Sequence, residues 1–522
     1  MRPASGWPVG WLVVIIPALA ELIVGGYRIG VPSLWRDEAA TISGSQRSLS
    51  AIVTMVGHQD AVHAPYYVLM HPVIAVGGTS ATVLRLPSLI AMTLAAGLTG
   101  ALGRRLTQAS GLPGPAIVGL LAGLGLAAVP LTTRYAQEAR PYALTTLFAV
   151  AASYAFLRAL ESPRWRWWVA YAASLLLAGL FNLFAVLLVI AHGVSLIWLA
   201  RVNAAVSDRD GQPAAVSAAM VRRWLASCAA AVVLLGPVIV LSAGQSTQLN
   251  WVRRPGFGTL AALVRDFSGA TALIPVIAVI ALLGCAAGLG PSGGQKRPAL
   301  TAIALPWLVV PPVLLIVVSF IHPYYVERYV LYCLPALAIL VAAGLVWLVT
   351  LTRRALAGRG LRARLADLLA AAPSAVLALL IVGVLIGPQR EIRQVNARPD
   401  DLKAVAAAVA GHERPGDGVL YLPRDADAVG EAYPAAFRHL RDIGLGSSAL
   451  ASGTLRGIAA PPRVVASRLA HLRRLWTVQW VHPLSTSSAA PSQLTRILSG
   501  LHLIRSWRIQ SVVLRLYAAS SR

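Results

Sequence analysis

Long apolar runs alternate with short polar segments along the first three quarters of the chain. Each run has about 20 residues, the length of a helix that crosses a bilayer. The runs lie near residues 8–29, 83–103, 113–131, 141–158, 167–181, 183–200, 224–243, 271–290, 299–320, 329–351 and 370–388. We therefore predict a polytopic α-helical membrane protein with about eleven transmembrane helices.

One further apolar stretch, Pro65 to Gly77, is ambiguous. If it crossed the membrane, the basic loops at Arg104 and Arg222 would lie on opposite sides. If it lies in the interface or dips in and returns, all basic loops share one side, which the positive-inside rule makes cytoplasmic. We therefore predict an interfacial or re-entrant helix. The polar segments then expected outside are residues 31–82, 132–140, 244–270 and 321–328.

The pattern changes after Arg390, where apolar runs give way to short mixed elements. Residues 400–410 predict a helix opened by acidic capping residues. Residues 418–422, 475–481 and 511–517 predict strands. We expect a transmembrane catalytic domain over residues 1–388, with its active site in the outer loops, and an extracytoplasmic α/β domain over residues 389–522.

Composition agrees with a membrane protein and argues against nucleic acid as a partner. The chain is 57% hydrophobic, only 12% charged, and carries a net charge of +25. Lysine occurs only at Lys296 and Lys403, so this charge comes from arginines, which lie mostly between the apolar runs as the positive-inside rule expects. The three cysteines fall inside predicted spans and form no disulfide framework or cysteine metal motif.

Two adjacent carboxylates, Asp37 and Glu38, open the first outer segment. A carboxylate at the membrane surface can accept a proton from an acceptor hydroxyl while that hydroxyl attacks a sugar carbon. The alternative is that these acids only cap the helix that follows them. Composition alone does not separate the two interpretations.

The second and third outer segments add charges that a simple connecting loop would not need. Arg140, just before a helix that begins near Pro141, is suited to bind a phosphate. Arg328 also lies outside, at the start of a span. The alternatives are a surface ion pair between Arg134 and Glu138, and an aromatic belt formed by the neighbouring tyrosines. We expect Asp37, Arg140 and Arg328 to surround one cavity that receives a lipid-linked sugar phosphate.

Five motifs in order resemble those of the GT-C glycosyltransferases of the protein O-mannosyltransferase and aminoarabinose transferase superfamily. They are Trp35-Arg36-Asp37-Glu38-Ala39, His63-Ala64-Pro65-Tyr66-Tyr67, Leu84-Arg85-Leu86-Pro87-Ser88, the run from Arg134 to Tyr142, and Glu327-Arg328-Tyr329-Val330-Leu331. The resemblance covers residues 1 to about 350. It departs from the family at Ala64 and Tyr66, where His-Pro-Pro-Leu-Tyr is usual.

The resemblance implies an enzyme that uses polyprenyl-phosphate sugars on the outer face, with inversion at the anomeric carbon. Asp37 would be the base, with Glu38 supporting it or binding the acceptor, and Glu138 would be the acid of the second loop. The remaining assignments are donor-phosphate binding by Arg140, Arg328, His322 and Tyr325, and sugar or acceptor binding by His63, Tyr66 and Gln137.

Three further features are left open by the sequence. His58, Asp60 and His63 have the chemistry of metal ligands, and relatives differ in metal use, but solvated polar residues on an interfacial helix are the favoured interpretation. Glu21 lies within the first span, where a carboxylate needs a partner or a cavity. Trp251 and the arginines after it either line the acceptor path or form a surface cluster.

We therefore predict a multi-pass plasma-membrane enzyme with its active site on the extracytoplasmic face. The Ala- and Arg-rich composition suggests a high-GC bacterial genome. Among such bacteria the resemblance implies mannose, transferred from a polyprenyl-phosphate donor to an envelope glycan or glycolipid. The alternatives are an arabinofuranosyltransferase, a lipid or glycan transporter without chemistry, and an inactive subunit. Transporters place ionisable residues near the membrane midplane, whereas these acids lie mostly in outer segments.

Overall fold

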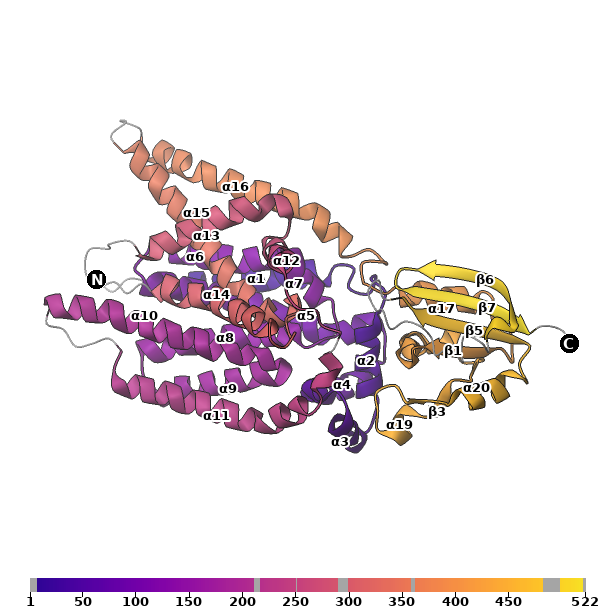
Figure 1. The fold of residues 1–522 in the computed structure, drawn as a ribbon. Coiled ribbons are helices and arrows are strands. Elements are labelled where there is room, and N and C mark those ends of the chain that lie inside the picture. The colour runs from indigo at the N-terminus through magenta and orange to yellow at the C-terminus, as the bar shows by residue number, and fades with distance from the viewer. Residues whose placement is uncertain are drawn as a thin grey trace. The chain divides into compact units, whose positions relative to one another are not determined.

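The computed structural model describes residues 7–210, 216–249, 251–289, 299–357, 362–481 and 498–519. Its contacts divide the chain into two units. The first unit comprises Met1–Tyr27 and Leu86–Glu391, and the second comprises Arg28–Arg85 and Ile392–Arg522. Each unit is described by itself below, with the element labels of Figure 1.

The first unit is helical. Its α-helices are α1 (Trp7–Gly26), α5 (Ala81–Ala109, whose first five residues belong to the second unit), α6 (Pro115–Ala128), α7 (Pro130–Ala136), α8 (Tyr142–Glu161), α9 (Trp165–Phe181), α10 (Leu187–Asp210), α11 (Ala218–Ala243), α12 (Phe257–Ser268), α13 (Ile274–Leu289), α14 (Ala299–Ser319), α15 (Leu334–Leu356) and α16 (Ala363–Glu391), joined in part by short 3-10 helices η2 (Leu183–Val186), η3 (Ser246–Leu249), η4 (Thr271–Leu273) and η5 (Glu327–Cys333). Several, such as α8, α9, α10 and α11, run alongside one another in Figure 1.

Every apolar run that the sequence analysis singled out is helical. Among the described residues, eight helices are long and apolar enough to cross a membrane, or nine if α6 and α7, which meet at a bend of 67°, form one broken span. The prediction of a multi-pass helical protein is therefore confirmed, whereas the count of about eleven stays a prediction. Pro130 begins α7, where its missing N–H costs the helix no hydrogen bond.

Small residues allow the membrane-type helices to approach closely. A Cβ added at Gly344 of α15 would lie 1.9 Å from the carbonyl oxygen of Ile280 of α13, and one at Gly284 would lie 2.0 Å from that of Leu340. Any side chain at either glycine would therefore force α13 and α15 apart. Close backbone approach through small residues is the usual way in which helices pack inside lipid.

The second unit joins the first predicted outer segment to the C-terminal residues. Its N-terminal part contains α2 (Arg36–Ser45), α3 (Leu49–His58), η1 (Ala61–His63) and α4 (Ala64–Gly77). Leu455 of the C-terminal part packs against Ile52 and Met55 of α3 and Tyr67 of α4 in one buried cluster. This grouping differs from the expected division, in which residues 28–85 were assigned to the membrane domain.

Helix α4 is the segment whose crossing of the membrane was ambiguous. It has 14 residues, so at about 1.5 Å per residue it is shorter than the roughly 30 Å hydrocarbon core. Its Tyr67 packs on Gly44 of α2, where a Cβ would lie 2.8 Å from the ring. Both the length and the packing agree with a helix that does not span, and its position in the interface stays a prediction.

The C-terminal part of the second unit is an α/β fold. A five-stranded sheet has the order β2 (Arg441–Asp442), β1 (Gly418–Leu422), β5 (Arg474–Trp480), β7 (Val512–Ala519), β6 (Leu501–Ile509). Strands β2, β1 and β5 are parallel, and β7 and β6 are antiparallel additions. The other elements are α17 (Leu402–Ala410), η6 (Arg424–Asp427), α18 (Ala428–Ala432), η7 (Pro434–Ala436), β3 (Leu445–Ser447), α19 (Ala449–Ser452), β4 (Ile458–Ala459) and α20 (Pro462–Leu469).

The elements predicted in this part are confirmed. The Asp401 side chain accepts a hydrogen bond from the Ala404 N–H at 3.0 Å and so caps α17, as the acidic residues there indicated. The three predicted strands correspond to β1, β5 and β7. Strand β6 was not predicted, because most of its residues are exposed and polar residues interrupt its apolar ones without strict alternation.

A buried ion pair fixes the start of α2 within the second unit. Glu38 and Arg85 are both fully buried, and the Arg85 Nε and Nη2 each donate to a separate Glu38 carboxylate oxygen at 2.8 Å. Arg85 also donates to the carbonyl oxygens of Ile29, Pro32 and Ser33. One guanidinium thus holds both the loop that enters α2 and the first turn of α2.

We expect Arg85→Ala to lower the free energy of unfolding by about 3–5 kcal/mol, because it leaves the Glu38 carboxylate buried without this partner. The thermal midpoint of the purified protein in nanodiscs would measure the loss. Arg105→Ala is the matched control: Arg105 pairs with Glu161 at the surface, and such pairs contribute at most about 1 kcal/mol. Equal effects of the two substitutions would contradict a fixing role for Arg85.

Candidate active site

Asp37 lies in the first turn of α2, after an N-cap residue, Trp35, whose side chain forms no capping hydrogen bond. The α2 helix therefore relies on the negative charges of its first turn to complement the free N–H groups at its start. This position agrees with the capping alternative for Asp37 and is equally compatible with a role in chemistry, because the side chain is only partly buried. Both carboxylate oxygens of its neighbour Glu38 accept hydrogen bonds from Arg85, so Glu38 is held in place at the start of α2.

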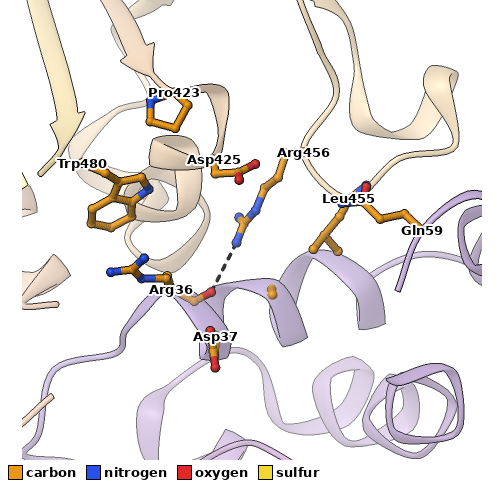
Figure 2. Close-up of a pocket in the computed structure, with 9 residues that line it drawn as sticks. Arg36, Asp37, Gln59, Pro423, Asp425, Leu455, Arg456 and Trp480 are labelled. Atoms are coloured by element: carbon orange, nitrogen blue, oxygen red, sulfur yellow. Dashed lines mark hydrogen bonds between the residues drawn. The ribbon is translucent and has the colours of Figure 1, made fainter. Parts of the chain in front are cut away.

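Asp37 borders a cavity of about 190 Å³ within the second unit (Figure 2). Its lining residues come from α2 and from four separate loops or strand ends. They are Arg36, Asp37, Ala40, Gln59, Pro423, Asp425, Leu455, Arg456 and Trp480. In Figure 2 the Arg456 side chain, from the loop before β4, extends toward Arg36 at the start of α2, whereas the Asp37 carboxylate points away from Asp425.

Arg36 anchors α2 to the C-terminal part of the second unit. Its Nε and Nη2 donate to the two carboxylate oxygens of Asp400 at 2.7 and 2.8 Å, and its backbone N–H donates to Asp400 at 3.3 Å. The guanidinium carbon lies 4.8 Å from the centre of the Trp480 ring. Arg456 in turn donates from Nη2 to the Arg36 carbonyl oxygen at 3.3 Å. These contacts fix one wall of the cavity.

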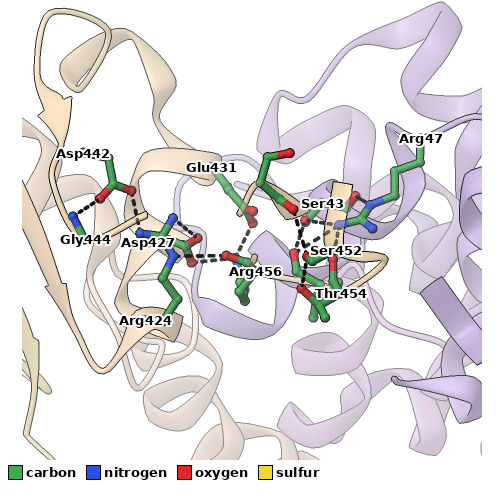
Figure 3. Close-up of polar contacts among 12 residues, drawn as sticks. Ser43, Arg47, Arg424, Asp427, Glu431, Asp442, Gly444, Ser452, Thr454 and Arg456 are labelled. Atoms are coloured by element: carbon green, nitrogen blue, oxygen red, sulfur yellow. Dashed lines mark hydrogen bonds and ion pairs between the residues drawn. The ribbon is translucent and has the colours of Figure 1, made fainter. Parts of the chain in front are cut away.

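Arg456 belongs to a network of largely buried charges (Figure 3). Arg456 pairs with Glu431 and lies 3.6 Å from Asp427, while Arg424 pairs with Asp427 at 3.1 Å and with Asp442 at 2.5 Å. Two guanidinium groups thus face three carboxylates. Burial raises the pKa of Asp427 to about 8, even though the neighbouring Arg456 favours its charged form.

Polar residues at the start of η1 and in α4 form a local cluster. His63 Nδ1 and Asp60 Oδ1 lie 2.6 Å apart, and the Tyr67 hydroxyl donates to the other Asp60 oxygen. Tyr66 is fully buried. His58 bonds to the Thr54 carbonyl oxygen at 2.9 Å. Among the described residues, no group of three His, Cys, Asp or Glu side chains is arranged to hold a metal ion.

The second predicted outer segment lies in the first unit. Gln137 is buried, and its amide nitrogen donates to the carbonyl oxygens of Gly25 and Tyr27 at 2.8 and 2.9 Å. This nitrogen therefore supplies hydrogen bonds to carbonyl oxygens at the end of α1. The expected contact of Gln137 with a sugar stays a prediction. Glu138 is 1% exposed and lies 3.6 Å from Arg134, so this ion pair is buried on the carboxylate side rather than on the surface.

Arg140 and Arg328 belong to two segments that meet in the first unit. Arg140 is largely buried and precedes α8, which begins at Tyr142. The Arg328 guanidinium lies 5.8 Å from the ring centre of Tyr142, 5.6 Å from that of Trp251 and 5.8 Å from that of Tyr329. Arg328 belongs to predicted outer segment 321–328 and Trp251 to segment 244–270, and Tyr142 begins α8 just after segment 132–140, so three separate parts of the chain meet around this guanidinium group.

The two remaining donor-phosphate candidates differ in exposure. The Tyr325 side chain is buried, and its backbone N–H donates to the Ser319 hydroxyl at 2.8 Å. His322 is exposed, with its ring centre 6.1 Å from that of Tyr324. Because Asp37 belongs to the second unit and Arg140 and Arg328 to the first, the expected common cavity for these three residues stays a prediction.

Sequence analysis missed several residues of the cavity, namely Asp425, Arg456 and Trp480. A usable signal was present: Asp425 follows predicted strand 418–422, and Trp480 ends predicted strand 475–481. Had the two strands been recognised as parallel neighbours, their carboxyl ends would have been expected to meet at a ligand site. The partners of Arg456 lie more than 20 residues away in sequence, so no local pattern indicated them.

Comparison with known proteins agrees with the predicted superfamily. Residues 63–209 match the family model described as dolichyl-phosphate-mannose-protein mannosyltransferase. No curated protein sequence matches the chain. Among solved structures, ArnT from Cupriavidus metallidurans in the apo state has 15% identity and a TM-score of 0.57, with 97% of this chain and 98% of ArnT covered.

Two further solved structures resemble the chain. ArnT from the same organism bound to undecaprenyl phosphate has 16% identity and a TM-score of 0.57, with 98% of this chain and 99% of that one covered. The Archaeoglobus fulgidus oligosaccharyltransferase tethered to an acceptor peptide has 12% identity and a TM-score of 0.45, with 90% and 69% covered. The two ArnT structures show that the chain has the fold of ArnT, and the match of residues 63–209 to a mannosyltransferase family model agrees with the predicted superfamily.

We expect the stability of the second unit to decrease with rising pH because of Asp427. Its pKa is raised from 3.8 to about 8, so the folded unit binds one proton more than the unfolded chain between these values. The associated stability is fully present below pH 4 and is lost as the pH rises through 8. Asp427→Asn should remove this dependence.

Thermal midpoints measured between pH 5 and pH 9 would test this expectation, with the wild-type protein and Asp367→Asn as references. Asp367 is an exposed carboxylate paired with Arg353. An unchanged pH slope in Asp427→Asn would contradict the assignment of the proton to Asp427.

Proposed function

From the fold of a GT-C glycosyltransferase and the partial match to one family of that superfamily, we propose that this chain transfers a sugar from a polyprenyl-phosphate donor to an extracytoplasmic acceptor. The observation that carries the proposal is the position of Arg328, whose guanidinium lies near Trp251 of predicted outer segment 244–270 and near Tyr142, just after predicted outer segment 132–140, where it can supply the positive charge that a lipid-linked phosphate requires. The structure of ArnT with bound undecaprenyl phosphate supports a donor of this class.

Asp37 is the proposed general base. It is the acid of the first outer segment, it is partly exposed, and its helix is held by Arg36 and by the Glu38–Arg85 pair. A fixed carboxylate can accept the proton of the acceptor hydroxyl as that oxygen bonds to the anomeric carbon, which promotes departure of the polyprenyl phosphate. Glu38 is a positioning residue in this account, because Arg85 occupies both of its oxygens.

Arg140 and Arg328 are the proposed phosphate ligands. The face of the Arg328 guanidinium packs on aromatic rings, and a guanidinium group binds a phosphate through its N–H edge. Arg140 lies beside the start of α8, where free backbone N–H groups and the helix dipole also favour a phosphate. Glu138, Tyr325 and His322 lie on the same two segments and complete the proposed donor site.

Mannose is the proposed sugar, and an envelope glycan or glycolipid is the proposed acceptor. The name of the family model that matches residues 63–209 includes a polyprenyl-linked mannose donor and supports mannose over arabinofuranose. The helices that could cross a membrane support a multi-pass protein, and the distribution of basic loops supports a reaction on the extracytoplasmic face of the plasma membrane. His63 and Tyr66 stay candidates for sugar contact.

Asp37→Asn should lower kcat for mannose transfer by about 100-fold or more, because general-base catalysis contributes about 10²- to 10⁴-fold. The KM for polyprenyl-phosphomannose should change little. Transfer of radiolabelled mannose by purified protein in nanodiscs would measure both constants. Asp367→Asn is the control, and an Asp37→Asn enzyme with wild-type kcat would exclude Asp37 as the base.

Arg328→Ala should raise the KM for the polyprenyl-phosphate donor by about 10- to 100-fold, because a hydrogen bond to a charged group contributes about 1.5–3 kcal/mol. Arg254→Ala is the matched control, since Arg254 is an exposed arginine of the predicted outer segment 244–270. The same assay with varied donor concentration gives the two constants. Equal KM values in the two variants would argue against phosphate binding by Arg328.

A further inference from the structure

The cavity of Figure 2 lies beside β1, the strand of the second unit at which the order of the parallel strands in the sheet reverses. The chain passes from β1 to β2 on one side, and the next strand of this sheet, β5, lies on the other side of β1. The gap between the carboxyl ends of β1 and β5 is therefore a topological switch point, which is where open α/β sheets bind ligands. Pro423 and Asp425 follow β1, and Trp480 ends β5, so both strands direct their ends to the cavity.

The cavity has the size and the rigidity of a site for one small ring. At roughly 30 Å³ per water molecule, its volume of about 190 Å³ equals about six waters, which suits one sugar ring. Its walls are fixed, because Arg36 is held by Asp400 and Arg456 by Glu431. Gln59 is held in turn by the Leu455 N–H, which donates to its side-chain oxygen at 3.1 Å.

The charges around the cavity disfavour an anion. Both lining arginines are already paired with carboxylates, whereas Asp425 is exposed and adds negative charge at the opening. The turn after β1 also lacks the glycine-rich sequence that cradles a phosphate. A neutral polyol fits better, because the Asp425 carboxylate and the Gln59 amide supply an acceptor and donors beside an aromatic side chain, Trp480.

We propose that this cavity binds one neutral sugar ring of the acceptor glycan, at a distance from the ring that receives the new sugar. The inference rests on the proposed function and names a second site for the same substrate. Because the Asp37 carboxylate points away from Asp425 across the first turn of α2, the ring in the cavity is not the reacting one (Figure 2). An acceptor with two or more rings binds to both sides of this turn, and a single-ring acceptor does not use the cavity.

The test compares two synthetic acceptors, octyl mannoside with one ring and octyl dimannoside with two, in the transfer assay with full-length protein in nanodiscs. Asp425→Asn should raise the KM for the dimannoside about 10-fold. It should leave kcat, the donor KM and the KM for the monomannoside unchanged. Trp480→Phe is a second variant with the same expected pattern, and Asp367→Asn is the control that alters no constant.

Several outcomes would overturn the proposal. They are equal dimannoside KM values in Asp425→Asn and wild type, an equal rise for both acceptors, a change confined to the donor KM, or a rise seen only with a Ser/Thr-rich acceptor peptide. If wild-type protein transfers to neither sugar, saturation-transfer NMR with methyl dimannoside decides separately. The site is supported, even though the proposed function fails, if wild-type protein binds methyl dimannoside, Asp425→Asn weakens this binding and inorganic phosphate does not displace the sugar. The site is overturned if wild-type protein does not bind methyl dimannoside.

Discussion

Charged groups taken out of water need partners, and in the second unit those partners come from opposite ends of the chain. Arg36 and Asp400 are separated by 364 positions and form a two-point ion pair in which the Asp400 side chain is fully buried. Arg456 donates to the Arg36 carbonyl oxygen, and Arg47 donates to the carbonyl oxygens of Thr454 and Leu455. Since removing one member of such a pair leaves an uncompensated charge, helix α2 is fixed to the α/β fold. The position of Asp37 depends on these contacts.

The same constraint explains the roles of the two adjacent acids. Asp37 and Glu38 are neighbours in the first turn of α2, yet Glu38 is fully buried against Arg85 whereas Asp37 is partly exposed. One acid therefore holds the helix, and the other is presented at its surface. A site that must hold a reacting group within a fraction of an ångström gains from such a division, because the supporting pair limits the motion of the catalytic turn.

Most of the fold could be predicted from the sequence because hydropathy reports burial in lipid directly. The apolar runs, the capping acid at Asp401 and strands β1, β5 and β7 were all recognised from local patterns. The grouping of residues 28–85 with the C-terminal residues was not, because it depends on ion pairs and a packed cluster between segments hundreds of residues apart. For the same reason Asp37, Arg140 and Arg328 could be chosen as candidates, but the contacts of Arg456 and Gln137 could not be foreseen.

The proposed reaction is a direct displacement in which Asp37 takes a proton from the acceptor while arginines bind the departing phosphate. A single displacement inverts the anomeric centre, whereas a covalent sugar–enzyme intermediate would retain it. The most direct test is the anomeric configuration of the transferred sugar, read by NMR from product made with a donor of defined configuration. The account predicts the configuration opposite to that of the donor. A product with the donor's configuration would contradict it.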